Sequence, residues 1–164
     1  MKQSGFAWTN LIKSLILLIT LANCGFKPML SISESNFSID KIEYSGMLGR
    51  QLNNNLKQYH QKKGGDHNYS LVAETAESRE ITLKDKKGNP SSFRLGVSVD
   101  LSVFENNKLV FKKNFKQAFD YSNSSKKFDL SKFEDEIKKS MLDKISEEIV
   151  LSLYSIQWSL NHLK

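Results

Sequence analysis

The chain has 164 residues, a formal net charge of +6 and one cysteine, so a single domain of ordinary size is expected and an internal disulfide is excluded. Hydrophobic residues make up 39% and charged residues 26%, and there are only two prolines, which is typical of a folding globular chain and not of a disordered one. The modest positive charge favours anionic partners such as nucleic acid, phosphorylated glycolipid or a membrane surface, without choosing among them.

The first 23 residues have the pattern of a secretory signal. Lys2 and Lys13 precede an apolar run that is uncharged over residues 14–26 and is interrupted at Asn23. A transmembrane helix needs about 20 apolar residues, so this run is too short to remain as a membrane span. We expect residues 1–23 to be removed, which leaves 22 basic against 18 acidic residues.

Cys24 stands directly after this run. The residues Leu21-Ala22-Asn23-Cys24 resemble the bacterial lipobox, in which the cysteine sulfur is lipidated and the cysteine becomes the new N-terminus. The resemblance makes Cys24 the expected lipid attachment point, and Gly25 after it implies sorting to the outer membrane. Residues 24–36 are then expected to be a lipidated N-terminus followed by a polar tether.

The folded domain is expected over residues 37–164. Phe37 and Ile39 indicate a first strand. From Met47 onward the apolar residues fall at helical spacing, and Gly64-Gly65 is expected to end this first helix.

Three further strands are expected, joined by turn sequences. Residues 69–83 indicate a strand that runs into the turn-forming residues 84–90. Over residues 93–103, apolar side chains alternate strictly with polar or small ones, which is the strongest strand signal in the chain. The asparagines at 106–107 can adopt the positive φ angles of a two-residue turn, and residues 109–119 form the last strand.

A long amphipathic helix is expected near the C-terminus. Ser131 with Glu134 three residues later is typical of a capping box, so the helix is predicted to begin there. Apolar residues then recur at steps of three or four, and Glu134 is predicted to pair with Lys138 on the exposed side. The order β-α-β-β-β-α predicts an α+β fold, with a single antiparallel-rich four-stranded sheet and two helices packed on one face as a two-layer sandwich.

No pattern of catalytic or cofactor-binding residues is found. His60, His67 and His162 are far apart, with no cysteine or carboxylate at metal-ligand spacing. The acidic side chains accompany lysines as on a solvated helix face, and no phosphate-loop motif surrounds the paired glycines. We therefore expect a protein that is not an enzyme and has no metal and no cofactor.

Several segments resemble the lipopolysaccharide-assembly lipoprotein family, LptE, and especially its alphaproteobacterial members. They are Cys24-Gly25-Phe26-Lys27-Pro28-Met29-Leu30, residues 48–56, Phe93-Arg94-Leu95 and residues 120–124. Membership implies an outer-membrane lipoprotein on the periplasmic side that plugs and helps assemble an LptD-type β-barrel. It also implies binding of lipopolysaccharide on its way to the outer leaflet.

The basic turn is the candidate binding site for this glycolipid. Lys84, Lys86 and Lys87 cluster there, and Arg94 follows in the next strand. Lipid A and the inner-core sugars carry phosphates and carboxylates, for which ammonium and guanidinium groups are suitable partners. The alternative is an ordinary solvated turn.

Two other functions are left open by the sequence. Phe93, Phe111 and Phe115 could stack bases in a nucleic-acid binder, although the export signal and the strand alternation, which places these rings in the core, argue against it. The chain could also be a lipid-anchored adaptor or pilot lipoprotein for another outer-membrane complex.

Overall fold

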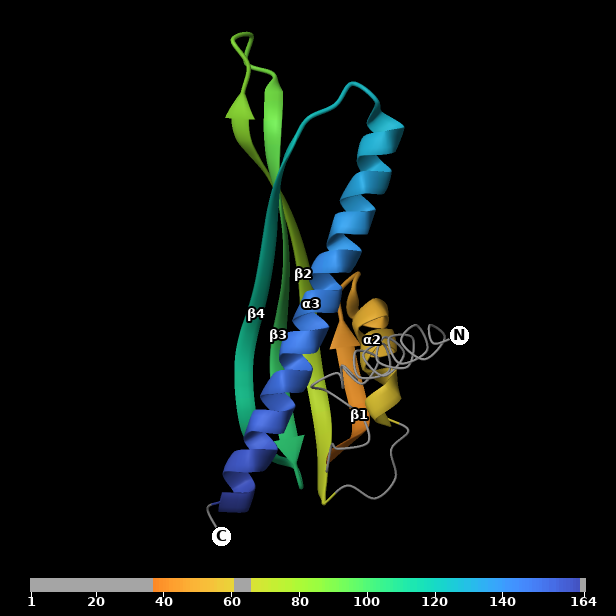
Figure 1. Ribbon diagram of the computed structural model, residues 1–164, viewed down its shortest axis with the longest axis vertical. Coiled ribbons are helices and arrows are strands. Elements are labelled where there is room, and N and C mark those ends of the chain that lie inside the picture. The colour runs from red at the N-terminus through yellow and green to blue at the C-terminus, as the bar shows by residue number, and fades with distance from the viewer. Residues whose placement is uncertain (1–36, 61–65, 163–164) are drawn as a thin grey trace, which may run out of the picture. The chain divides into compact units, whose positions relative to one another are not determined.

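The computed structural model describes residues 37–60 and 66–162 (Figure 1). The predicted order of elements is confirmed. In chain order they are β1 (Phe37–Ser45), α2 (Gly49–His60), β2 (His67–Lys84), β3 (Pro90–Glu105), β4 (Lys108–Ser122) and α3 (Lys127–His162). The predicted signal peptide, Cys24, the tether over residues 24–36 and the glycines at 64–65 lie outside the described residues.

The four strands form one sheet in the order β1-β2-β3-β4. The pairs β2–β3 and β3–β4 are antiparallel, whereas β1 is parallel to β2. The parallel pair arises because α2 carries the chain back between β1 and β2, and parallel neighbours require such a crossover. The predicted antiparallel-rich sheet is confirmed, with one parallel pair at its edge.

The side of the sheet that faces the helices forms the core. On β3, the six alternating apolar side chains at odd positions from 93 to 103 are at most 5% exposed. Leu52 and Leu56 of α2 are fully buried, as are Ile145 and Ile149 of α3. Figure 1 shows both helices on this one face, so the predicted two-layer sandwich is confirmed.

Both antiparallel connections are tight turns built from the predicted residue types. Asn106 and Asn107 have φ angles of 51° and 62°, the left-handed conformation that a two-residue hairpin turn requires. In the β2–β3 turn, Gly88 has a φ of 83° and its amide donates to the Asp85 carbonyl at 3.0 Å. Asparagine and glycine tolerate this conformation better than other residues, which explains why the turns form at these positions.

The long helix α3 begins at Lys127, four residues before the predicted start at Ser131. Ser131 lies within the helix, so the predicted capping box is wrong. The Glu134 carboxylate does not cap the helix; it accepts hydrogen bonds from Arg79 and Tyr121 of the sheet. These contacts with the sheet replace the local hydrogen bond that a capping box would have formed. Although α3 has 36 residues, neither of the described helices is apolar enough along its length to cross a membrane.

Candidate functional site

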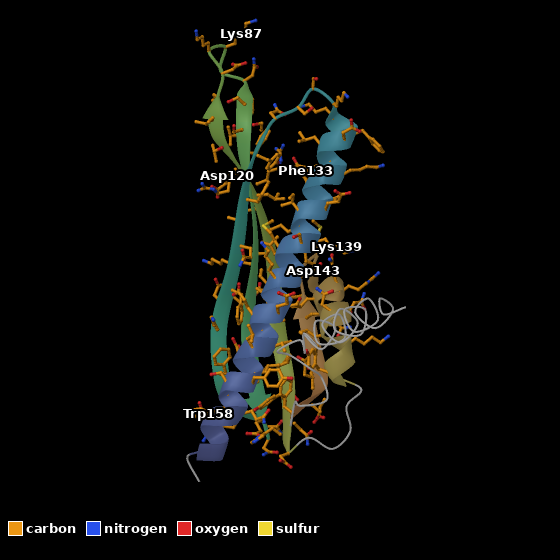
Figure 2. The ribbon with its side chains drawn as sticks, viewed as in Figure 1. Lys87, Asp120, Phe133, Lys139, Asp143 and Trp158 are labelled. Atoms are coloured by element: carbon orange, nitrogen blue, oxygen red, sulfur yellow. The ribbon has the colours of Figure 1, made fainter. Side chains whose placement is uncertain are left out.

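The β2–β3 turn and the end of β2 carry three exposed lysines at one end of the sheet, where Figure 2 labels Lys87. Lys84 is the last residue of β2, and Lys86 and Lys87 lie in the turn itself. The Asp85 carboxylate accepts hydrogen bonds from the backbone amides of Asn89 and Lys87 at 2.9 and 2.8 Å, and these contacts, those from Asn89 above all, lower the pKa of Asp85. Asp85 therefore holds the turn together, and within the part of the chain that the structure describes the three ammonium groups have no ion pair.

The connection from β4 to α3 brings two further lysines to the same end of the sheet. Asn123 fastens this connection to the hairpin, because its backbone amide donates to the Ser91 carbonyl at 2.9 Å and its side-chain amide donates to the Pro90 carbonyl at 2.8 Å. Lys126 and Lys127 follow soon after and are exposed. Sequence analysis missed these two lysines because they are distant in the chain from the first three. The signal that could have found them is a basic pair at the start of a helix.

We call Lys84, Lys86, Lys87, Lys126 and Lys127 the cationic end of the sheet. Apolar side chains are exposed in the same segments, with Ile81 and Leu83 of β2 at 51% and 63% and Phe128 of α3 at 71%. Single exposed apolar residues are ordinary, but here they accompany a concentration of positive charge. This end of the domain therefore offers both ammonium groups and apolar surface.

Arg94 is not part of the cationic end. It lies on the sheet face opposite the helices, where its Nε and Nη2 donate to the two carboxylate oxygens of Asp120 at 2.7 and 2.8 Å. The hydrogen bonds and the charge of this pair raise the pKa of Arg94 and lower the pKa of Asp120. The structure thus brings together three of the four predicted binding residues and leaves Arg94 already paired.

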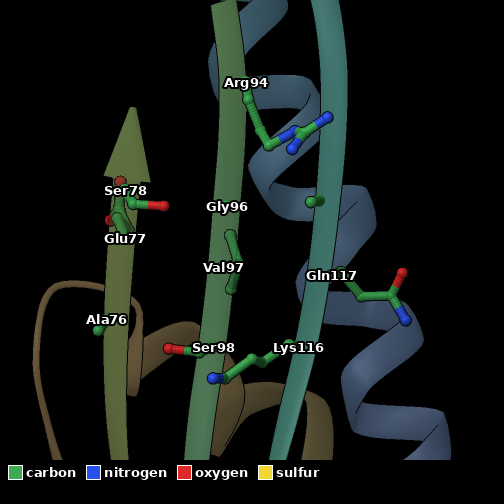
Figure 3. Close-up of a pocket in the computed structure, with 10 residues that line it drawn as sticks. Ala76, Glu77, Ser78, Arg94, Gly96, Val97, Ser98, Lys116 and Gln117 are labelled. Atoms are coloured by element: carbon green, nitrogen blue, oxygen red, sulfur yellow. The ribbon is translucent and has the colours of Figure 1, made fainter. Parts of the chain in front are cut away.

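Arg94 borders a shallow pocket of 350 Å³ on that open face (Figure 3). Small residues, among them Ser78, Gly96 and Ser98, line it together with Lys116. A serine–lysine catalytic pair needs a hydrogen bond between its two side chains. Among the described residues, no hydrogen bond joins Lys116 to Ser78 or to Ser98.

A partly buried polar cluster holds α3 against the sheet next to the cationic end. The Arg79 Nε donates to the Tyr121 hydroxyl at 3.0 Å and to Glu134 Oε1 at 3.1 Å, and the guanidinium lies 3.6 Å from the centre of the Phe93 ring. Burial, together with the hydrogen bond to Glu134, raises the pKa of Tyr121, so its hydroxyl keeps the proton that it donates to that carboxylate. The cluster therefore fastens the N-terminal part of α3 to β2 and β4.

The structure gives no support to the two other kinds of site considered from the sequence. Phe93 and Phe115 are buried and Phe111 is partly buried against the core, so these rings do not form an exposed platform for stacked bases. Within residues 37–60 and 66–162, no three histidine, cysteine or carboxylate side chains come together as metal ligands.

Comparison with known proteins identifies the fold. No protein-family model matches the chain, and no curated protein matches its sequence. Among solved structures, the chain is similar to the rare lipoprotein B from Shewanella oneidensis, with a TM-score of 0.59 and 17% identity over 74% of this chain and 99% of that one. It is also similar to a minor lipoprotein from Acinetobacter baumannii, with a TM-score of 0.56 and 14% identity over 73% and 92% of the two chains. A third is lipoprotein B from Nitrosomonas europaea, with a TM-score of 0.53 and 15% identity over 77% and 88%.

Proposed function

We propose that this chain is a lipid-anchored outer-membrane lipoprotein of the LptE family that faces the periplasm, binds lipopolysaccharide, and plugs and helps assemble an LptD-type β-barrel. The resemblance of its N-terminal and internal segments to that family supports the proposal. So does the fold, which it shares with several bacterial lipoproteins. Neither line of support depends on a catalytic group, and the proposed role is binding and scaffolding.

The cationic end is the observation that carries the glycolipid part of the proposal. Its lysines come from the end of β2, from the β2–β3 turn and from the segment in which α3 begins, and Asn123 links these segments through its hydrogen bonds to Ser91 and Pro90. One polyanionic ligand can therefore meet them at several points. Ammonium groups form strong charge-assisted hydrogen bonds with phosphate oxygens. The exposed Ile81, Leu83 and Phe128 add apolar surface, which suits a ligand that carries acyl chains beside its phosphates.

Reversing the charge of the β2–β3 turn is expected to weaken lipopolysaccharide binding. In the chain with Lys84→Glu, Lys86→Glu and Lys87→Glu, loss of charge-assisted contacts worth about 1.5–3 kcal/mol each should weaken binding at least about tenfold. Raising the salt concentration from about 0.1 M to 1 M shortens the screening length from about 10 Å to 3 Å and should weaken binding of the unmodified chain in the same direction. Surface plasmon resonance on immobilised lipopolysaccharide measures both effects.

A matched control carries the same change of charge elsewhere. Lys57→Glu, Lys139→Glu and Lys144→Glu alter exposed lysines on the two helices and should leave binding close to that of the unmodified chain. Equal losses in the two triple variants would mean that net charge alone governs binding and would remove the turn from the site. Both chains, like the unmodified one, are expected to co-purify an LptD-type barrel from solubilised envelopes, and failure of the unmodified chain to do so would exclude the barrel as its partner.

Replacing Cys24 by alanine is expected to release the protein from the outer-membrane fraction or to leave its signal uncleaved. One acyl chain gives only marginal membrane binding, whereas several chains on one N-terminal cysteine anchor a protein stably. Fractionation of the envelope and the mass of the mature chain measure the two outcomes. Normal cleavage with normal retention in the Cys24→Ala chain would show that the anchor lies elsewhere.

A further inference from the structure

A groove runs between the edge strand β4 and the C-terminal half of α3, and its volume is 470 Å³. Among the described strands, β4 pairs only with β3, so one side of its backbone faces outward along the groove. An edge strand of this kind presents unpaired amide and carbonyl groups to any added strand. The residues lining the groove are Val110, Phe111, Lys113, Ser152, Ser155, Ile156 and Ser159.

A break in the strand register gives the groove its apolar floor. Phe104 of β3 pairs with Leu109, and Val103 pairs with Phe111, so Val110 has no partner on β3. Such a bulge redirects a side chain from the ordinary alternation of a strand. Two consecutive apolar residues, Val110 and Phe111, consequently line the same groove.

The α3 side of the groove is uncharged. From Ile149 to Asn161 the helix contains no acidic or basic residue, whereas charged residues recur throughout residues 127–148. On the same segment but outside the groove lining, Leu151 and Trp158 are 49% and 65% exposed. A helix segment without charges and with exposed large apolar residues is typical of a surface that another molecule covers.

The exposed charges on β4 indicate that a partner at this edge of the sheet is acidic. Four exposed lysines lie along the strand, and its one acidic residue, Asp120, is bound by Arg94. At the margin of the groove, Glu148 accepts a hydrogen bond from Gln117 at 2.8 Å. Pairing with β4 of a second copy would place these lysines among like charges, which is unfavourable. The four lysines are Lys108, Lys112, Lys113 and Lys116.

We propose that this groove binds an extended acidic segment of another protein, which adds to the sheet as a fifth strand beside β4. In this mode of recognition, main-chain hydrogen bonds to the edge strand provide affinity and pockets for alternate side chains provide specificity. Alternate apolar side chains of the segment occupy the space over Val110, Phe111 and Ile156, and its carboxylates meet the β4 lysines. The groove and the cationic end lie at opposite ends of the sheet, as Trp158 and Lys87 show in Figure 2, so this proposal does not depend on glycolipid binding.

A labelled peptide of alternating glutamate and valine tests the proposal on the full-length chain. Fluorescence anisotropy should show saturable binding of this peptide, and at least about tenfold weaker binding of the matching lysine–valine peptide, because its charges repel those of β4. A version with N-methyl groups along one backbone edge cannot donate the strand hydrogen bonds and should bind at least about tenfold more weakly than the unmodified peptide. Hydrogen exchange should show new protection of amides within residues 112–117 when the unmodified peptide binds.

Two serine variants locate the site. Ser155→Arg places a long side chain in the groove, and we expect it to weaken peptide binding at least about tenfold. Ser140→Arg makes the same change at an exposed position on the same helix outside the groove, and it should bind as the unmodified chain does. No binding of the glutamate–valine peptide, binding without protection of β4, or equal binding by the two variants would each overturn the proposal.

Discussion

Truncating Ile149 to alanine is expected to lower the free energy of unfolding by about 2–5 kcal/mol. Its side chain has no exposed surface in the interior that α3 shares with the sheet. The change removes apolar contacts and leaves a cavity that the neighbouring side chains of a close-packed core fill only partly. Chemical denaturation of the full-length chain measures the loss, and Ile145→Ala should behave in the same way because Ile145 is equally buried.

Lys139→Ala is the matched control on the same helix. Lys139 is exposed, and even an exposed side chain that forms an ion pair contributes only about 0.2–1 kcal/mol. Lys138 is less suitable, because its side chain is only 22% exposed and its Nζ lies 3.1 Å from the Glu77 carboxylate. Similar losses for Ile149→Ala and Lys139→Ala would show that the helix presents a different side to the sheet.

Strand β3 shows why the sheet could be predicted from the sequence. A strand turns successive side chains to opposite faces, and one face of β3 is covered by helices while the other is open. Its apolar residues therefore had to alternate, and each of the six is buried as expected. The turn at Asn106 and Asn107 could be predicted for a similar reason, since few residues tolerate its backbone angles.

Glu134 and Lys138 show what local spacing could not predict. They are spaced as partners on one helix, yet Glu134 binds Arg79 and Tyr121, and Lys138 lies beside Glu77. These partners lie on the sheet, so the true pairing depends on how α3 packs against β2 and β4. Spacing along a helix contains no information about that packing.

The cationic end was predictable only in part for the same reason. Lys86 and Lys87 are neighbours in sequence, so their turn could be recognised as basic. Lys126 and Lys127 join them through hydrogen bonds from Asn123 to Ser91 and Pro90, and a contact between distant segments has no local signature. Arg94, although near the turn in sequence, is held by Asp120 across the β3–β4 pair.

Gly46→Ala is expected to destabilise the chain far more than Gly88→Ala. The two glycines have nearly the same backbone angle, with φ values of 84° and 83°, so alanine meets about the same conformational cost of 1–2 kcal/mol at each. Their surroundings differ. A Cβ at Gly46 would lie 2.0 Å from the Thr75 carbonyl oxygen, whereas a Cβ at Gly88 would meet nothing within 4 Å.

The clash at Gly46 involves backbone atoms that cannot rotate away. The Thr75 hydroxyl also donates a hydrogen bond to the Ser45 carbonyl at 2.9 Å. This bond holds the end of β1 close to Thr75 of β2. Relieving the clash therefore requires the end of β1 to separate from β2, and we expect a loss of more than about 4 kcal/mol, a size that few single substitutions reach. Urea denaturation measures the free energy of unfolding of both variants. Because the conformational cost is the same at the two positions, the difference between the variants gives the cost of the steric clash at Gly46. Equal midpoints would mean that β1 can move away from β2 at little cost, and that the parallel edge of the sheet is held less firmly than the antiparallel strands.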